Sequence, residues 1–360
     1  MRKPFISELQ FFFMIFVSIA SLTFLSVPSQ LIPKVNQDLW LSMCLGITID
    51  VFVAFLLYRL GLRYPGQSIV QYSRSILGPA GHLISLLLLL FFLGVCITTI
   101  WIYSDFLSSS LLPDSPLVSF SGTLTLCSGW AAFKGIETIA RLSQILGTII
   151  LLSTLILFAS SIPIFEASHL LPQFEHGAWP AVRGAAYPAS WFGVCIMMGM
   201  LMPHLSRPER TLPIKAYAVL LGAFIMTGYM MYSIAVLGAN MASQMKNPIF
   251  VYTRVAQFLI FERIEVLAVL VFVCGSFITY ATLYYCIAQG CRQLFGTKSY
   301  KPWIYAFAPL LVVLPVLDVM QRFGQWQPFL DFWFPVVALS VEGGITALLF
   351  VGSFFRKTKR

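Results

Sequence analysis

The apolar stretch LQFFFMIFVSIASLTFLSVPSQLIP, Leu9–Pro33, decides the fold class of this chain. It contains no charged residue, and it is longer than the roughly 20 apolar residues that a bilayer-spanning helix needs. Arg2 and Lys3 precede it, as in a secretory signal peptide, but the stretch is too long for one and ends without a small-residue cleavage site. We therefore expect a retained first membrane span.

The overall composition extends this conclusion to the whole chain. Hydrophobic residues make up 58% of 360 residues, about 209 in all, whereas only 37 residues are charged. Ten spans of about 20 residues would use about 200 apolar residues, which is nearly the whole supply. The composition excludes a soluble enzyme, a disulfide-stapled secreted domain and a disordered chain, and long unbroken apolar runs argue against an outer-membrane barrel. The seven cysteines form no CxxC motif, so we expect neither a disulfide framework nor a thiolate metal site.

Apolar runs separated by charges or by proline and glycine clusters predict an all-α integral membrane protein with ten transmembrane helices. The predicted spans are 9–33, 39–60, 82–107, 116–133, 142–163, 186–204, 213–240, 264–290, 303–320 and 332–355.

The basic residues predict how these spans are oriented in the lipid bilayer. With both termini cytoplasmic, seventeen of the 23 Lys and Arg residues fall on the inside, Lys215 among them, and six fall on the outside. The net charge of +9 is therefore read as an orientation signal, because no basic stripe suggests nucleic acid as a partner.

Two predicted spans are interrupted by polar residues or helix breakers. The first contains Ser18, Ser21, Thr23 and Pro28, and the sixth contains Pro188, Gly193 and Gly199. One such span opens each group of five, which is typical of an inverted-repeat transporter. We predict a single permease domain, 1–360, with repeats at about 9–163 and 186–355. For any one of these residues, close helix packing is the alternative explanation.

Asp50 and Glu342 are acidic residues near the middle of the second and tenth spans. Intramembrane acids are costly and face a partner, a cavity or an ion path. We predict a coupling or proton-linked role for each, and the alternative is a hydrogen-bonded acid that locks two helices. The chain has no catalytic motif and no metal-ligand spacing of histidines, so we predict no enzyme activity, no metal and no cofactor.

Several motifs recur in order along the chain and carry a resemblance to a known family. They are LSVPSQ at 25–30, YPGQSIVQYSRSILG at 64–78, KGIETIARLSQI at 134–145 and NPIFVYTRVAQFLIFERIEVL at 247–267. Over essentially its whole length, the chain resembles the endospore germination permeases. These are the B subunits of spore nutrient germinant receptors, within the amino acid, polyamine and organocation transporter superfamily.

The resemblance implies a leucine-transporter-like bundle, five plus five inverted, with broken helices 1 and 6 and a small-molecule site between helices 1, 3, 6 and 8. The positions that it assigns to this ligand-binding site are Ser21, Thr23, Phe91, Val95, Phe192, Gly193, Cys195, Ser276 and Thr279. It also implies that A and C receptor subunits are partners and that the protein lies in the inner membrane of the spore. Family members often have glycines where this chain has Ser21 and Thr23, and many have an acid where it has Cys195.

We therefore predict a germinant-receptor subunit that binds a small nutrient, an amino acid, and triggers germination together with its partner subunits. One alternative is an autonomous amino acid or amine permease, coupled to protons through Asp50 or Glu342. A second is a structural or ion-releasing membrane component whose pocket binds nothing. The identity of the germinant stays open at this point.

Overall fold

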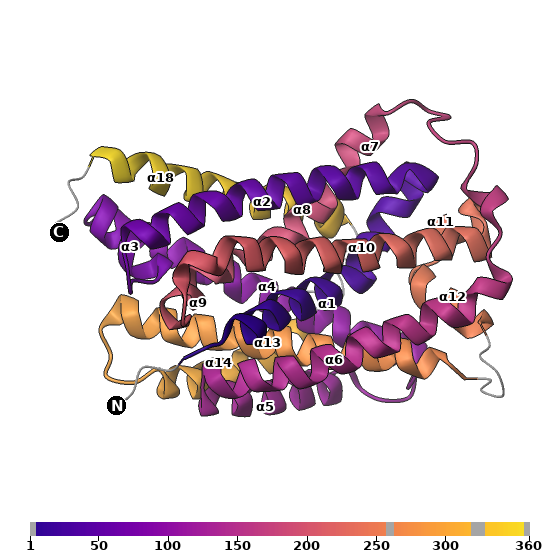
Figure 1. The fold of residues 1–360 in the computed structure, drawn as a ribbon. Helices are drawn as coiled ribbons and strands as arrows, with labels where there is room; N and C mark the ends of the chain where they lie inside the picture. Colours follow the sequence, from indigo (N-terminus) through magenta and orange to yellow (C-terminus); the bar gives the residue numbers. More distant parts are fainter. Residues whose placement is uncertain (1–4, 257–262, 318–327, 356–360) are drawn as a thin grey trace.

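The computed structural model describes residues 5–256, 263–317 and 328–355, and it is a bundle of long helices (Figure 1). Within these ranges the β structure is limited to one isolated bridge between Ile6 and Leu205. The start of α1 and the end of α18 lie at the same end of the bundle as the short helix α3. We call this the α3 end and the opposite one the α12 end.

The first half of the chain forms six α-helices. They are α1 (Glu8–Val35), α2 (Leu39–Arg63), α3 (Ile69–Leu77), α4 (Ala80–Ser110), α5 (Leu117–Lys134) and α6 (Ile136–Ser161). Between α1 and α2 the chain reverses direction through a short 3-10 turn, η1 (Asn36–Asp38), in which Asn36 has a positive φ of 52°.

The second half is more interrupted. Its helices and turns include α7 (Trp179–Gly184), α8 (Ala186–Phe192), η4 (Gly193–Met197), α9 (Met198–Leu201), η5 (Met202–His204), α10 (Thr211–Leu237), α11 (Ala239–Gln244), α12 (Pro248–Val255), α13 (Glu265–Phe295), α14 (Lys301–Val313), η8 (Phe329–Trp333), α17 (Phe334–Leu339), η9 (Ser340–Ile345) and α18 (Thr346–Phe355). Both η8 and η9 are π-helical, and η4 and η5 are 3-10 turns.

The apolar helices identify a multi-pass membrane protein. In the described part of the chain, six helical segments are long and apolar enough to cross a bilayer, and one of them, Glu8–Arg63, contains both α1 and α2. All ten predicted spans contain helical structure, although 318–320 of the ninth lie outside the described residues. Large apolar side chains such as Leu126 and Phe224 are exposed, as expected for a lipid-facing surface.

The centre of the bundle is occupied by α1. Every residue from Phe13 to Pro28 is buried, and this helix packs against α6, α8, α10 and α13. A helix that is apolar on all sides is typically buried on all sides. The stretch of sequence that predicts the first span thus also forms the core.

The prediction that this first helix is broken was wrong, because α1 is continuous from Glu8 to Val35. Two of the polar side chains expected to interrupt it bond within the helix. The Ser18 hydroxyl donates to the Met14 carbonyl at 2.7 Å, and the Thr23 hydroxyl donates to the Ile19 carbonyl at 2.6 Å. Bonds of this kind to the preceding turn let serine and threonine remain inside a helix.

Candidate functional site

A hydroxyl pair joins the two central helices at the predicted binding site. The hydroxyls of Ser21 on α1 and Thr279 on α13 lie 2.7 Å apart and are both buried. The helices approach closely here, because a Cβ built on Gly275 would lie 2.6 Å from the Cβ of Ser21. Two residues that the sequence assigns to one site, 258 positions apart, are therefore in direct contact.

The other predicted site residues belong to the same four-helix region but are packed in the core. Thr23, Phe91, Val95, Phe192 and Ser276 are all at most 8% exposed. Gly193 begins the 3-10 turn η4, and the side chain of Cys195 lies outside the described residues. Contact among these residues is shown for Ser21 and Thr279 alone, so a shared ligand site remains a prediction.

An aromatic cluster covers the α12 side of this region. The Phe272 ring on α13 is 6.2 Å from Phe24 on α1, and it is 5.9 Å from Tyr103 and 5.0 Å from Phe106 on α4. Phe106 in turn contacts Phe250 of α12 at 5.1 Å. Since Phe24 and Phe272 each lie beyond Ser21 and Thr279 toward the α12 end, this aromatic cluster packs on that side of the hydroxyl pair.

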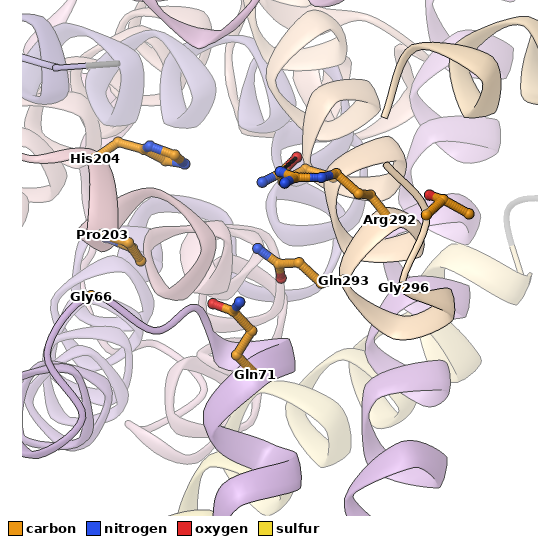
Figure 2. Close-up of a pocket in the computed structure, with 9 residues that line it drawn as sticks. Gly66, Gln71, Pro203, His204, Arg292, Gln293 and Gly296 are labelled. Atoms are coloured by element: carbon orange, nitrogen blue, oxygen red, sulfur yellow. Dashed lines mark hydrogen bonds between the residues drawn. The ribbon is translucent and has the colours of Figure 1, made fainter. Parts of the chain in front are cut away.

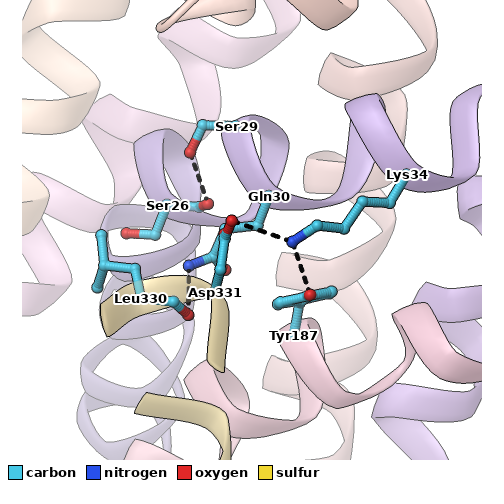
Figure 3. A network of polar contacts seen from close by, with 7 residues as sticks. All are labelled: Ser26, Ser29, Gln30, Lys34, Tyr187, Leu330 and Asp331. Carbon is cyan, nitrogen blue, oxygen red and sulfur yellow. Dashed lines mark hydrogen bonds and ion pairs between the residues drawn. The ribbon is translucent and has the colours of Figure 1, made fainter. Parts of the chain in front are cut away.

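A polar network holds the same end of the bundle together (Figure 3). The Lys34 ammonium donates to the Tyr187 hydroxyl at 2.7 Å and lies 3.2 Å from a carboxylate oxygen of Asp331. The Gln30 side chain donates to the Leu330 carbonyl at 2.9 Å. These contacts tie α1 to α8 and to the π-helix η8, and the sequence reasoning did not identify them.

The α3 end instead holds a polar cavity of about 520 Å³ (Figure 2). Gln71 of α3, His204 of η5 and Gln289, Arg292 and Gln293 of α13 contribute to its lining. None of the predicted site residues lines it. Gln289 is ten residues from Thr279 on the same helix, which corresponds to about 15 Å along the axis. The region around Ser21 therefore lies between closed aromatic packing and a polar cavity.

The sixth predicted span changes its helix type at Gly193, where α8 is followed by the 3-10 turn η4. Short 3-10 stretches within a helix often mark a hinge. The carboxylate of Glu342, in the π-helix η9, lies directly against this glycine, and a Cβ at Gly193 would overlap it. Gly193 thus allows the tenth span to place an acid against the interruption of the sixth.

Asp50 and Glu342 belong to one charged cluster, whereas the sequence analysis treated them as isolated acids. The Lys215 ammonium on α10 donates to Asp50 Oδ1 at 2.8 Å, and both side chains are at most 1% exposed. Glu342 is 1% exposed and close enough to interact electrostatically with Asp50 and Lys215.

Assigning Lys215 to an inner loop was therefore wrong, because this residue lies buried within a helix. The signal that could have identified it was its position inside the predicted span 213–240. A positive charge in that position needs an acidic partner.

The side chains of the predicted ligand site have the chemistry to bind and orient a small molecule. Buried hydroxyls on α1 and α13 can accept or donate hydrogen bonds, while Phe91, Val95 and Phe192 can form an apolar wall. The described residues include no group of three or more His, Cys, Asp or Glu side chains that could hold a metal ion.

Comparison with solved structures shows a transporter fold. Mhp1, a nucleobase-cation-symport-1 family transporter in a closed conformation with bromovinylhydantoin bound, aligns with a TM-score of 0.71, 14% identity and coverage of 97% of this chain and 78% of that one. MhsT in complex with L-phenylalanine aligns with a TM-score of 0.68, 15% identity and coverage of 97% and 90%. These identities establish similarity of fold alone.

Sequence comparison identifies the family. Spore germination protein YndE of Bacillus subtilis is 27% identical over 329 residues, covering 89% of this chain and 88% of that protein. Spore germination protein KB of the same organism is 24% identical over 325 residues, covering 88% and 86%. The model of a permease family described as "Spore germination protein" matches residues 5–321. Since this match extends over most of the sequence, the chain belongs to the spore germination protein family of membrane permeases.

Proposed function

We propose that this chain is the membrane subunit of a spore nutrient germinant receptor, which binds an amino acid and triggers germination together with A and C subunits. Membership of the spore germination family supports the physiological role. The observation that carries the site is the buried contact between Ser21 and Thr279, which joins the two helices expected to hold the ligand. The proposal places the protein in the inner spore membrane with both termini cytoplasmic.

The proposed ligand site lies between α1, α4, the α8–η4 junction and α13. Hydroxyls of Ser21, Thr23, Ser276 and Thr279 and backbone groups at Gly193 would bind the amino and carboxylate groups. Phe91, Val95 and Phe192 would shape the side-chain pocket, and Cys195 would complete it. This division follows the usual design of small-molecule sites, in which a few polar groups orient the ligand within an apolar lining.

The architecture that goes with this proposal has ten spans in two inverted repeats, about 9–163 and 186–355. The interrupted segment from α8 to η5 would move during signalling, because its 3-10 turns are held by fewer regular hydrogen bonds than an α-helix. Ligand binding would shift the population between two bundle states and pass this shift to the partner subunits.

The proposed site is tested by filling it. Val95→Phe should abolish ligand binding and the nutrient response, because Val95 is 1% exposed and the phenyl ring would occupy the proposed pocket. Leu90→Phe is the matched control on α4, since Leu90 is 53% exposed and faces away from the core. Amino acid binding by the purified protein and germination of spores that carry each variant are the measurements. An undiminished response in a correctly inserted Val95→Phe protein would contradict the site.

Autonomous proton-coupled transport is a second candidate, favoured by the buried ion pair between Asp50 and Lys215. It predicts that the protein alone, in proteoliposomes, takes up an amino acid or amine down a proton gradient and that Asp50→Asn abolishes uptake. A receptor subunit should bind its ligand in the same vesicles without net uptake.

A further inference from the structure

The cluster of Asp50, Lys215 and Glu342 has an unbalanced set of charges. It contains two acids and one base, and each of these residues is at most 1% exposed. If all three were ionised, the cluster would carry one uncompensated negative charge inside the membrane-spanning bundle. An uncompensated ion in a low-dielectric interior is strongly unfavourable even after the surroundings relax, so this state is disfavoured.

The hydrogen bonds show which acid has the excess charge. Lys215 donates to Asp50 Oδ1 at 2.8 Å, so these two groups neutralise each other. Both carboxylate oxygens of Glu342 are buried and have no hydrogen-bond partner among the described residues. A buried carboxyl group in such surroundings becomes neutral by binding a proton.

The packing around Glu342 favours a proton over a metal ion. Its carboxylate is pressed against Gly193, where even a methyl group would overlap it. The charged groups close enough to act on it electrostatically are Asp50 on α2 and Lys215 on α10, and no set of acidic, histidine or cysteine ligands for a metal is present in the described ranges. A proton needs neither a coordination sphere nor additional volume.

We propose that Glu342 is the binding site for one proton and that its protonation is coupled to the position of the η4 turn at Gly193. The proton comes from bulk water and forms an O–H bond on the carboxylate, and no other bond changes. In the packed state described above, Glu342 holds the proton. When η4 moves and water reaches the carboxyl group, the proton returns to water. This inference stands independently of the germinant-receptor role, since it requires no ligand and no partner subunit.

Infrared spectroscopy of the purified full-length protein tests the proposal directly. The wild type should show the C=O band of one buried carboxylic acid, and labelling its glutamates with a heavy carbon isotope should shift this band. Glu342→Gln should abolish the band. Lys215→Met should double it, because Asp50 then loses its cationic partner and binds a proton as well.

Glu265→Gln is the control, because Glu265 is also buried but pairs with Arg263 at 3.2 Å. Its spectrum should match that of the wild type. The isotope measurement needs no substitution, so it decides the assignment even if a variant does not fold. A band that is insensitive to glutamate labelling, or one that persists in folded Glu342→Gln protein, would overturn the proposal.

Discussion

The hydroxyl pair of Ser21 and Thr279 and the charged cluster of Asp50, Lys215 and Glu342 are both buried, yet they join helices by different chemistry. The hydroxyls are neutral, and their two protons are shared among three contacts within hydrogen-bond distance: the one between them, and one from each hydroxyl to a carbonyl of its own helix. In the charged cluster, Asp50 Oδ2 and both oxygens of Glu342 have no partner among the described residues. The neutral pair therefore has an acceptor for each of its protons, whereas the charged cluster keeps carboxylate oxygens that are free to bind a proton.

Removing the base of the charged cluster should have the largest effect on stability. Lys215→Met leaves Asp50 without its cation, and breaking a buried ion pair in this way destabilises by about 3–5 kcal/mol. The loss should be smaller at acidic pH, because Asp50, which must bind a proton in the folded variant, takes it up more readily there. Thermal unfolding of the purified protein over a range of pH measures both effects.

The matched control for this substitution is Lys246→Met. Lys246 pairs with Asp105 at 2.7 Å, but its side chain is 60% exposed, so the expected loss is at most ~1 kcal/mol. The double variant Lys215→Met/Asp50→Leu should regain much of the lost stability, since it removes both partners. Equal losses of stability for Lys215→Met and Lys246→Met would show that burial does not make the Asp50–Lys215 ion pair more costly to break than an exposed one.

The second prediction tests packing rather than charge, at the contact between Gly193 and Glu342 in the charged cluster. Gly193→Ala should destabilise by about 1–3 kcal/mol, because its methyl group must displace the Glu342 carboxylate. Gly343→Ala is the control, since Gly343 follows Glu342 directly and a Cβ there meets nothing within 4 Å. Thermal unfolding compares the two variants. If Gly193→Ala had no effect on stability, the Glu342 carboxylate would be free to move aside.

The third prediction concerns the neutral pair. Thr279→Val removes the hydroxyl that Ser21 contacts and should cost about 1 kcal/mol, the usual net value of one buried hydrogen bond. Thr282→Val, three residues further along α13, removes a hydroxyl bonded to the Ile278 carbonyl of its own helix alone and should cost less. Unfolding free energies of the two variants measure the difference. Equal values would argue against a stabilising contact between α1 and α13.

The sequence predicted much of this architecture because membrane spans leave a strong local signal. A long apolar run such as Leu9–Pro33 identifies a span, since no other environment accepts it. The all-helical transporter fold and the family were confirmed by the comparisons. The unbroken course of α1 was missed, because composition does not reveal whether Ser18 and Thr23 bond within their helix or interrupt it.

The site was harder to predict, because it depends on contacts between spans. Asp50 and Glu342 were recognised as costly acids, but Lys215, which pairs with Asp50, lies 165 residues from it in the chain. Pairing across that distance is determined by how α2 and α10 pack, which no local pattern records. The same holds for Lys34 and Tyr187 at the α12 end, 153 residues apart.

The smallest expected effect is at the α12 end of the bundle. There the ion pair of Lys34 and Asp331 is partly exposed, so it can be compared with the buried charged cluster. The Lys34 and Asp331 side chains are 39% and 30% exposed, so water and salt screen their attraction. Lys34→Met should therefore cost at most ~1 kcal/mol despite removing two contacts. This cost should shrink further at high salt, whereas the cost of Thr279→Val should not change. Tyr187→Phe serves as the control, because it removes the hydroxyl bonded to Lys34 and keeps the ion pair. The free energy of unfolding, measured at low and at high salt, tests this prediction. A loss in Lys34→Met that does not depend on salt would show that this ion pair is shielded from solvent, like the buried charged cluster.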